Sequence, residues 1–367
     1  MTDNELFHLL AILKIEGVGD IMAKKLIAHC GSAEKVFQAK TNFLKNIDGV
    51  GKGLLQNFKN PSVFVLAKNE MDYINKNNIS CCSYLEENYP DRLKYCIDGP
   101  VLLFSAGAIN WNNKKIISIV GTRQVSAHGI DFCKKLIQDL APLNPIIVSG
   151  FAYGVDIVAH QTALENNLQT VAVLAHGLNQ IYPKSHKKYV SKIEQKGGFI
   201  TEFWSTSSPE KENFVKRNRI VAGISEATIV IESAEKGGSL ITALLANDYN
   251  RDVFAVPGRT TDKFSQGCNN LIKTQRAHLL TSAADLIYIL NWEIHNQEKQ
   301  SIQKQLFVSL NEIEQKIYDY LLAQGKTEID QIALECDYPV FKTSSVLVNM
   351  ELKGVIRPLP GKLFEAI

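Results

Sequence analysis

The stretch IISIVGTRQVSAHG (116–129) decides the fold, because an apolar, β-branched run is followed directly by a glycine-containing turn. The same succession recurs in VSGFAYGVD (148–156), VLAHGLNQIYP (173–183) and ESAEKGGSLITA (232–243). Nearly continuous apolar runs are typical of strands buried on both faces of a parallel sheet. Ligands bind such sheets outside the carboxyl ends of the strands. The sequence therefore predicts an α/β fold whose site lies in these four turns.

Six short runs alternate with helical periods between residue 116 and about residue 291, which predicts at least six strands joined by crossover helices. They are IISIV (116–120), IIVS (146–149), TVAVL (170–174), FIT (199–201), ATIVIE (227–232) and DVFAV (252–256). The turns that follow these runs supply exposed amides and helix N-termini, which favour anions, and phosphate above all. The alternative is that the glycines serve only close packing of helices on the sheet.

Two flanking modules differ from this pattern. IEGVGDIMAKKLI (15–27) and IDGVGKGLLQNF (47–58) resemble paired helix-hairpin-helix motifs. Three helical periods and two short strands after residue 309 predict a winged helix, whose third helix offers Lys342 and Lys353. Either module serves DNA binding or protein packing. The predicted domains are 1–65, 66–291 and 309–367, with a polar linker at 292–308.

The composition restricts any nucleic-acid site to a local patch, since 40 Lys and Arg face 38 Asp and Glu in 367 residues. The seven cysteines are scattered and form no C-x-x-C pair, which is typical of reduced thiols. No apolar run reaches the roughly 18 residues that span a bilayer, and the N-terminus has no basic segment before its apolar stretch. We expect a cytoplasmic protein without a membrane partner.

FVKRNRIVAGIS (214–225) carries the sharpest local signal. Phe214 offers a ring on which a base can stack, and an arginine can bind a phosphate through two hydrogen bonds. Arg217 and Arg219 lie two residues apart on a predicted helix, so they face different partners. The alternative for one of them, Arg219, is an internal pair with a carboxylate such as Glu202 or Glu232.

Signals for a cofactor or for catalysis are weak. GTRQVSAHG lacks the G-x-G-x-x-G spacing of dinucleotide sites, and no G-x-x-x-x-G-K-[ST] phosphate loop is present. Histidines near the turns are not paired for a metal, and Ser149 and Ser239 have no evident base, so we expect them to bind phosphate or cap helices. We expect no cofactor, no metal and no catalytic residue.

These segments together resemble the DNA-processing protein A family (DprA, also called Smf), which acts in bacterial natural transformation. The likeness runs from about 85 to 290 and includes YPDRLKYCIDGPVLLFSAG (89–107), SGFAYGVDIVAHQTAL (149–164), KGGSLITALLA (236–246) and GCNNLI (267–272). It implies an extended Rossmann-like fold. It also implies binding of single-stranded DNA without strong sequence preference, a homodimer, and loading of RecA recombinase onto incoming strands.

The resemblance also assigns residues by matching each turn to the family's motifs. The implied DNA-binding residues are Gly121, Arg123, Ser149, Gly150, Phe214, Arg217, Arg219, Lys236, Gly238 and Ser239. A competing hypothesis is an enzyme resembling the nucleoside-monophosphate phosphoribohydrolases, because KGGSLITA is similar to their glycine turn. The Arg and Glu pairing that those enzymes use is not evident.

Overall fold

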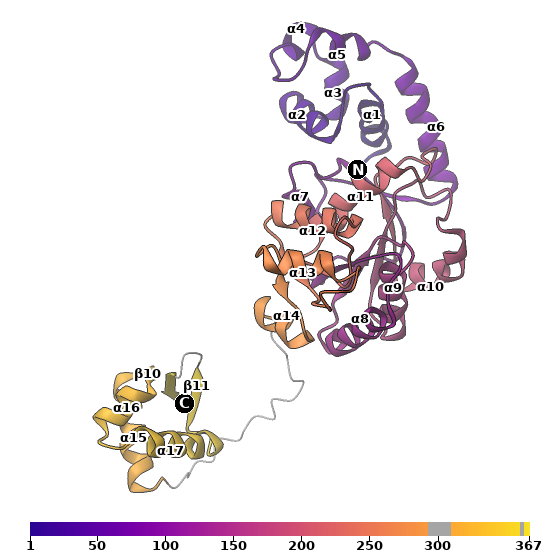
Figure 1. The fold of residues 1–367 in the computed structure, drawn as a ribbon. Helices are drawn as coiled ribbons and strands as arrows, with labels where there is room; N and C mark the ends of the chain where they lie inside the picture. Colours follow the sequence, from indigo (N-terminus) through magenta and orange to yellow (C-terminus); the bar gives the residue numbers. More distant parts are fainter. Residues whose placement is uncertain (293–309, 360–362) are drawn as a thin grey trace. The chain divides into compact units, whose positions relative to one another are not determined.

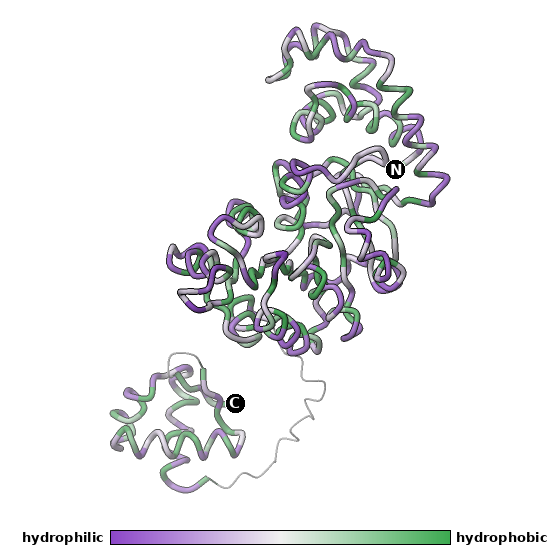
Figure 2. Tube along the Cα trace, turned by 45° about the vertical axis from the view of Figure 1, so that its right-hand side comes forward, coloured by the Kyte–Doolittle hydropathy of each residue, from purple (hydrophilic) through white to green (hydrophobic). Residues whose placement is uncertain are grey.

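A computed structural model describes residues 1–292, 310–359 and 363–367 (Figure 1). The chain divides into two compact units, Met1–Ile294 and His295–Ile367. Apart from Trp292, the predicted linker at 292–308 lies outside the described residues. Hydrophilic and hydrophobic residues alternate along the helical turns, as they do in helices that bury one face (Figure 2).

Six helices form the N-terminal part of the first unit. They are α1 (Asp3–Leu13), α2 (Asp20–Cys30), α3 (Ala33–Gln38), α4 (Thr41–Leu44), α5 (Lys52–Asn57) and α6 (Ser62–Lys76). Gly17 and Gly49 occupy equivalent places before α2 and α5, with φ of +88° and +89°. That left-handed conformation suits glycine, so each GVG turn requires its first glycine for the backbone. The predicted pair of helical hairpins is confirmed.

A nine-stranded sheet follows, in the order β1-β2-β6-β5-β4-β3-β7-β8-β9. Its strands are β1 (Ser80–Ser83), β2 (Leu102–Gly107), β3 (Ile116–Val120), β4 (Ile146–Ser149), β5 (Thr170–Val173), β6 (Gly197–Thr201), β7 (Ala227–Val230), β8 (Asp252–Ala255) and β9 (His278–Leu279). All six predicted strands are present, and β3 to β9 pair in parallel. The sequence reading missed β1 and β2, which pair antiparallel, and the two-residue β9.

Helices cover both faces of this sheet, as expected for a doubly wound fold. The Ile117 and Ile119 face packs against α8 (Ala127–Leu140), α9 (Val155–Glu165) and α14 (Ala283–Ile289). The Ile116 and Val120 face packs against α7 (Asp91–Lys94), α11 (Lys211–Ile224), α12 (Gly238–Asp248) and α13 (Gln266–Lys273). Near β5 and β6 lie the 3₁₀ helix η2 (Lys184–Tyr189) and α10 (Val190–Lys196), and η1 (Ala141–Leu143) follows α8.

The N-terminal helices are packed onto the sheet and share its core. Leu102, Phe104 and Trp204 belong to the same buried cluster as the apolar faces of α1, α2 and α6. The Lys14 ammonium lies 3.9 Å from the ring centre of Trp204. The boundary predicted between 65 and 66 falls inside α6. One continuous core therefore fixes the helical hairpins against the α/β part.

The second unit is a winged helix, as predicted. It contains α15 (Glu312–Gln324), β10 (Thr327–Glu328), α16 (Ile329–Glu335), α17 (Val340–Leu352), β11 (Ile356–Leu359) and β12 (Leu363–Ala366), with the strand order β10-β12-β11. On α17 the side chain of Lys342 is exposed, but Phe341 and Leu352 are about as exposed, at 80% and 82%. Lys353 pairs with Glu314 at 2.6 Å. The third helix thus presents a mixed, largely apolar surface.

Candidate nucleic-acid interface

A cleft opens where the strand order reverses. β3 is flanked by β4 on one side and by β7 on the other, so the loops after these three strands separate and leave a crevice at their carboxyl ends. The cleft has a volume of about 490 Å³. Its walls come from residues 120–123 after β3, 150–156 after β4, 233–242 after β7, and one side of α11. Three of the four predicted turns therefore form the cleft, and no residue of the third turn, 173–183, lines it.

The structure brings most of the predicted binding residues together in this cleft. Seven of the ten line it, namely Gly121, Arg123, Gly150, Phe214, Arg217, Gly238 and Ser239. Ser149 is fully buried and donates its hydroxyl to the Ile119 carbonyl at 2.6 Å, so it ties β4 to β3. Lys236 is exposed and lies outside the lining, and Arg219 lies elsewhere.

Arg123 and Phe214 form a cationic and aromatic pair at the mouth of the cleft. The guanidinium carbon of Arg123 lies 5.3 Å from the ring centre of Phe214. Arg123 is exposed and has no carboxylate partner among the described residues. Tyr182 meets the same phenyl ring edge-on, with ring centres 5.8 Å apart. A cation without an ion pair beside two aromatic rings is suited to a nucleotide, whose phosphate and base need these two contacts.

Arg217 is buried behind this pair and holds the floor of the cleft. Its guanidinium donates to the Gly150 carbonyl at 2.7 Å and to the Val173 carbonyl. Burial lowers the pKa of Arg217 to about 10, and the nearby Asp156 partly offsets that effect. A Cβ on Gly150 would meet both side chains within 2.6 Å. Arg217 therefore fixes the ends of β4 and β5. Because it also lines the cleft, it adds a positive charge to the cleft floor.

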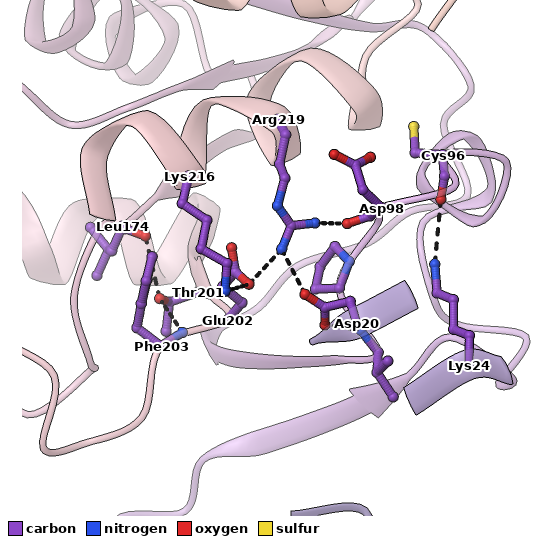
Figure 3. Close-up of polar contacts among 12 residues, drawn as sticks. Asp20, Lys24, Cys96, Asp98, Leu174, Thr201, Glu202, Phe203, Lys216 and Arg219 are labelled. Carbon is purple, nitrogen blue, oxygen red and sulfur yellow. Dashed lines mark hydrogen bonds and ion pairs between the residues drawn. The ribbon is translucent and has the colours of Figure 1, made fainter. Parts of the chain in front are cut away.

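Arg219 lies on a different side of α11 and belongs to an internal ion-pair network (Figure 3). It donates to Glu202 at 2.5 Å and to Asp20 at 3.0 Å, and also to the Asp98 carbonyl. Burial alone would lower the pKa of Arg219, but the carboxylates of Glu202 and Asp20 outweigh it and raise the pKa. The alternative in which Arg219 pairs with Glu202 is the one observed, and this arginine joins α2 to the sheet domain.

Two helices that follow the loops of the cleft, α8 and α9, have partners from the chain itself at their N-termini. At α8 the Glu232 carboxylate accepts from the Ser126 amide at 2.9 Å and from the Ser126 hydroxyl. At α9 the Val155 amide donates to the Thr122 carbonyl at 3.2 Å. Asp156 there accepts from the Ala152 amide at 3.2 Å. These contacts occupy part of the N-terminus of α8 and of α9.

The N-terminus of α12 is open. The amides of Gly238 and Ser239 have no acceptor among the described residues, and both residues line the cleft. A Cβ at Gly238 would meet nothing within 4 Å, whereas one at Gly121 would come within 2.5 Å of Val155. Packing therefore accounts for the glycine at 121 and leaves the glycine at 238 unexplained. Of the four predicted phosphate turns, this one best fits a ligand.

Sequence reasoning missed three residues that shape the site. Asp156 follows a glycine turn at the start of a helix, which was a usable signal. Glu232 was named only as a partner for Arg219, and it binds the loop that carries Arg123 instead. Tyr182 lies near the end of the predicted turn 173–183, and nothing in that segment indicates that its ring contacts Phe214. The contact between Glu232 and Ser126 joins residues that are 106 positions apart, so no local sequence pattern indicates it.

Family models match the sheet-containing part of the first unit and most of the second unit. Residues 80–291 match the model of DNA recombination-mediator protein A, and residues 308–362 match that of the DprA winged helix domain. The chain belongs to the DNA recombination-mediator protein A family. Among its curated relatives, Protein Smf of Synechocystis sp. is 33% identical over 282 residues, 74% of this chain and 69% of that protein. The DNA processing protein DprA of Streptococcus pneumoniae is 37% identical over 233 residues, 62% of this chain and 82% of that protein.

Solved structures of the DNA recombination-mediator protein A family agree with the fold. The X-ray structure of DprA from Streptococcus pneumoniae has a TM-score of 0.64 at 33% identity and covers 78% of this chain and 98% of its own. DprA from Helicobacter pylori, whose structure concerns a single-stranded DNA binding mode, has a TM-score of 0.53 at 29% identity. It covers 58% of this chain and 95% of its own. The predicted family and fold class are confirmed.

Two further findings concern metal sites and membrane-spanning helices. No group of three or more His, Cys, Asp or Glu side chains in the described part of the chain could hold a metal ion. Within that same part, no helix is long and apolar enough to cross a membrane. The cleft itself contains one carboxylate among its lining residues, Asp156, and burial raises the pKa of that group. The Arg217 guanidinium lies beside Asp156 and partly offsets that effect on its pKa.

Proposed function

We propose that this member of the DNA recombination-mediator protein A family binds single-stranded DNA in the cleft between β3, β4 and β7. The observation that carries the proposal is the Arg123 and Phe214 pair, which lies at the mouth of the same cleft as the open N-terminus of α12. A single strand offers both a phosphate and an unpaired base to such a site. Paired bases of a duplex are not available to an aromatic ring.

Each residue has a separate part in this proposal. The amides of Gly238 and Ser239 donate hydrogen bonds to one phosphate at the positive end of α12, and Arg123 neutralises the next. Phe214 stacks on a base. Lys236, exposed two residues before α12, adds a screened attraction. Gly121, Ser149, Gly150 and Arg217 form the support, and we assign no DNA contact to Arg219.

We further propose, on the strength of the family resemblance, that the protein is a cytoplasmic homodimer without catalytic activity that transfers bound strands to RecA recombinase. Sedimentation of the full chain tests the dimer. Nucleation of RecA on strands coated with a single-strand-binding protein tests the transfer. For the competing hypothesis of nucleotide hydrolysis, release of adenine from AMP is the direct assay. We expect no turnover, and sustained turnover would contradict a purely DNA-binding role.

Fluorescence anisotropy with a labelled oligonucleotide tests the cleft. Phe214→Leu keeps an apolar side chain but removes the stacking face, and we expect it to weaken binding by about 1–3 kcal/mol. Phe203→Leu is a matched control, because Phe203 lies outside the cleft lining. Equal affinity of the Phe214→Leu variant and the wild type, both folded, would remove the cleft from the proposed function.

A further inference from the structure

Two exposed tyrosines lie on a surface next to the cleft. Tyr182, which contacts Phe214, is 40% exposed, and Tyr153, in the loop after β4, is 47% exposed. The Ser185 hydroxyl, three residues beyond Tyr182, donates to the Tyr153 hydroxyl at 3.3 Å. Tyr182 therefore contacts Phe214 in the cleft, and η2, which follows Tyr182 in the chain, contacts Tyr153.

Buried groups beneath this surface fix Tyr153. His186 packs against Tyr153 with ring centres 5.0 Å apart and is itself only 5% exposed. A ring nitrogen of His186 is bonded to the Phe151 carbonyl at 3.1 Å. Phe151 is fully buried and takes a φ of +60°, a conformation that is rare for a bulky residue. The loop that carries Tyr153 is therefore held to η2, and the outer face of the Tyr153 ring is exposed to solvent.

The segment that carries Tyr182 and η2 is positively charged. Residues 177–193 contain four lysines and no Asp or Glu. Lys184, Lys187 and Lys188 are exposed on η2 and have no carboxylate partner in the described ranges. Exposed aromatic rings among unpaired cations are the two components of a surface for single-stranded nucleic acid.

We propose that Tyr153 and Tyr182 form a second base-stacking surface, which receives the part of a DNA strand that extends beyond the cleft. The ligand class is an unpaired nucleobase, with its phosphates facing the η2 lysines. This inference rests on the proposed function, since the strand must first occupy the cleft. It predicts that affinity continues to rise with oligonucleotide length after the cleft is filled.

The test compares affinity across a series of oligothymidylates from about four to about twenty nucleotides. Tyr153→Leu, which leaves the Tyr182 contact with Phe214 intact, should bind the shortest oligonucleotides as the wild type does and lose about tenfold or more for the longest. Tyr153→Phe should retain affinity, because the ring remains. Tyr288→Leu, which changes a tyrosine that is 82% exposed on α14, is the matched control.

The outcomes separate the two proposals. If Tyr153→Leu equals the wild type at every length while Phe214→Leu binds weakly, the second surface is wrong and the cleft stands. If Tyr153→Leu is weakened equally at every length, Tyr153 acts on the cleft and the second surface is again wrong. If the wild type binds none of the oligonucleotides, the proposed function fails as well.

Discussion

Arg219 and Glu202 form a buried ion pair at 2.5 Å, with side chains that are 8% and 4% exposed. The same Glu202 carboxylate also pairs with Lys216 at 2.9 Å, and that lysine is 52% exposed. One acid thus has a buried and an exposed cationic partner on a single helix (Figure 3). Since Arg219 also holds Asp20, the N-terminal helices depend on this contact.

Replacing the two cations should have unequal effects. Arg219→Ala leaves Glu202 without its buried partner, and we expect a loss of about 3–5 kcal/mol in the free energy of unfolding. Lys216→Ala is the matched control and should cost less than about 1 kcal/mol. Urea denaturation measures both. Equal losses would show that the burial of Arg219 has no energetic consequence.

Replacing Glu232 tests whether this carboxylate repels DNA or holds the loop that carries Arg123. Removing a negative charge beside an anion site should by electrostatics alone strengthen DNA binding. Because Glu232 holds Ser126 in the loop that carries Arg123, we expect Glu232→Ala to weaken binding instead, by roughly fivefold. Glu235→Ala, an exposed acid nearby, should strengthen binding slightly or not at all. Tighter binding by Glu232→Ala would contradict the positioning role.

Gly238→Ala should affect the stability of the protein and its affinity for single-stranded DNA differently. The added methyl group has open space around it, so the folded protein should be unchanged or more stable by about 0.4–1 kcal/mol. A phosphate against the α12 amides would meet that methyl group, and we expect affinity for single strands to fall roughly tenfold. Thermal melts and anisotropy on the same sample measure both quantities. Unaltered affinity would place the phosphate elsewhere.

Buried histidines should make the protein sensitive to acid. Burial lowers the pKa of His160 to about 3, and it also lowers the pKa values of His176 and His186. The unfolded chain takes up these protons near pH 6.5 and the folded chain does not, so stability should fall as pH drops from about 6.5 toward about 3. His160→Gln should flatten this dependence. The exposed His128→Gln should leave it as in the wild type, and an equal effect of both variants would exclude His160 as the cause.

The sequence predicted the strands, the turns and the separate directions of Arg217 and Arg219, because each of these follows from local periodicity. Which arginine would be buried against which partner did not follow. Arg217 meets the carbonyls of Gly150 and Val173, and Glu232 meets Ser126 across 106 residues. Such pairings arise only when the sheet brings distant turns together. The antiparallel strand β2 was missed for a different reason. Its residues LLFSAG include no β-branched side chain, so the segment lacks the local composition typical of a strand.

The most direct test of the central claim is a salt titration of binding to a single-stranded oligonucleotide and to a duplex of equal length, with the wild type and Arg123→Ala. We predict tighter binding of the single strand at every salt concentration. Arg123→Ala should weaken that binding and reduce the slope of log K against log salt by about one. Equal or tighter binding of the duplex, or an Arg123→Ala variant with unchanged affinity and slope, would contradict the assignment of the cleft to single-stranded DNA.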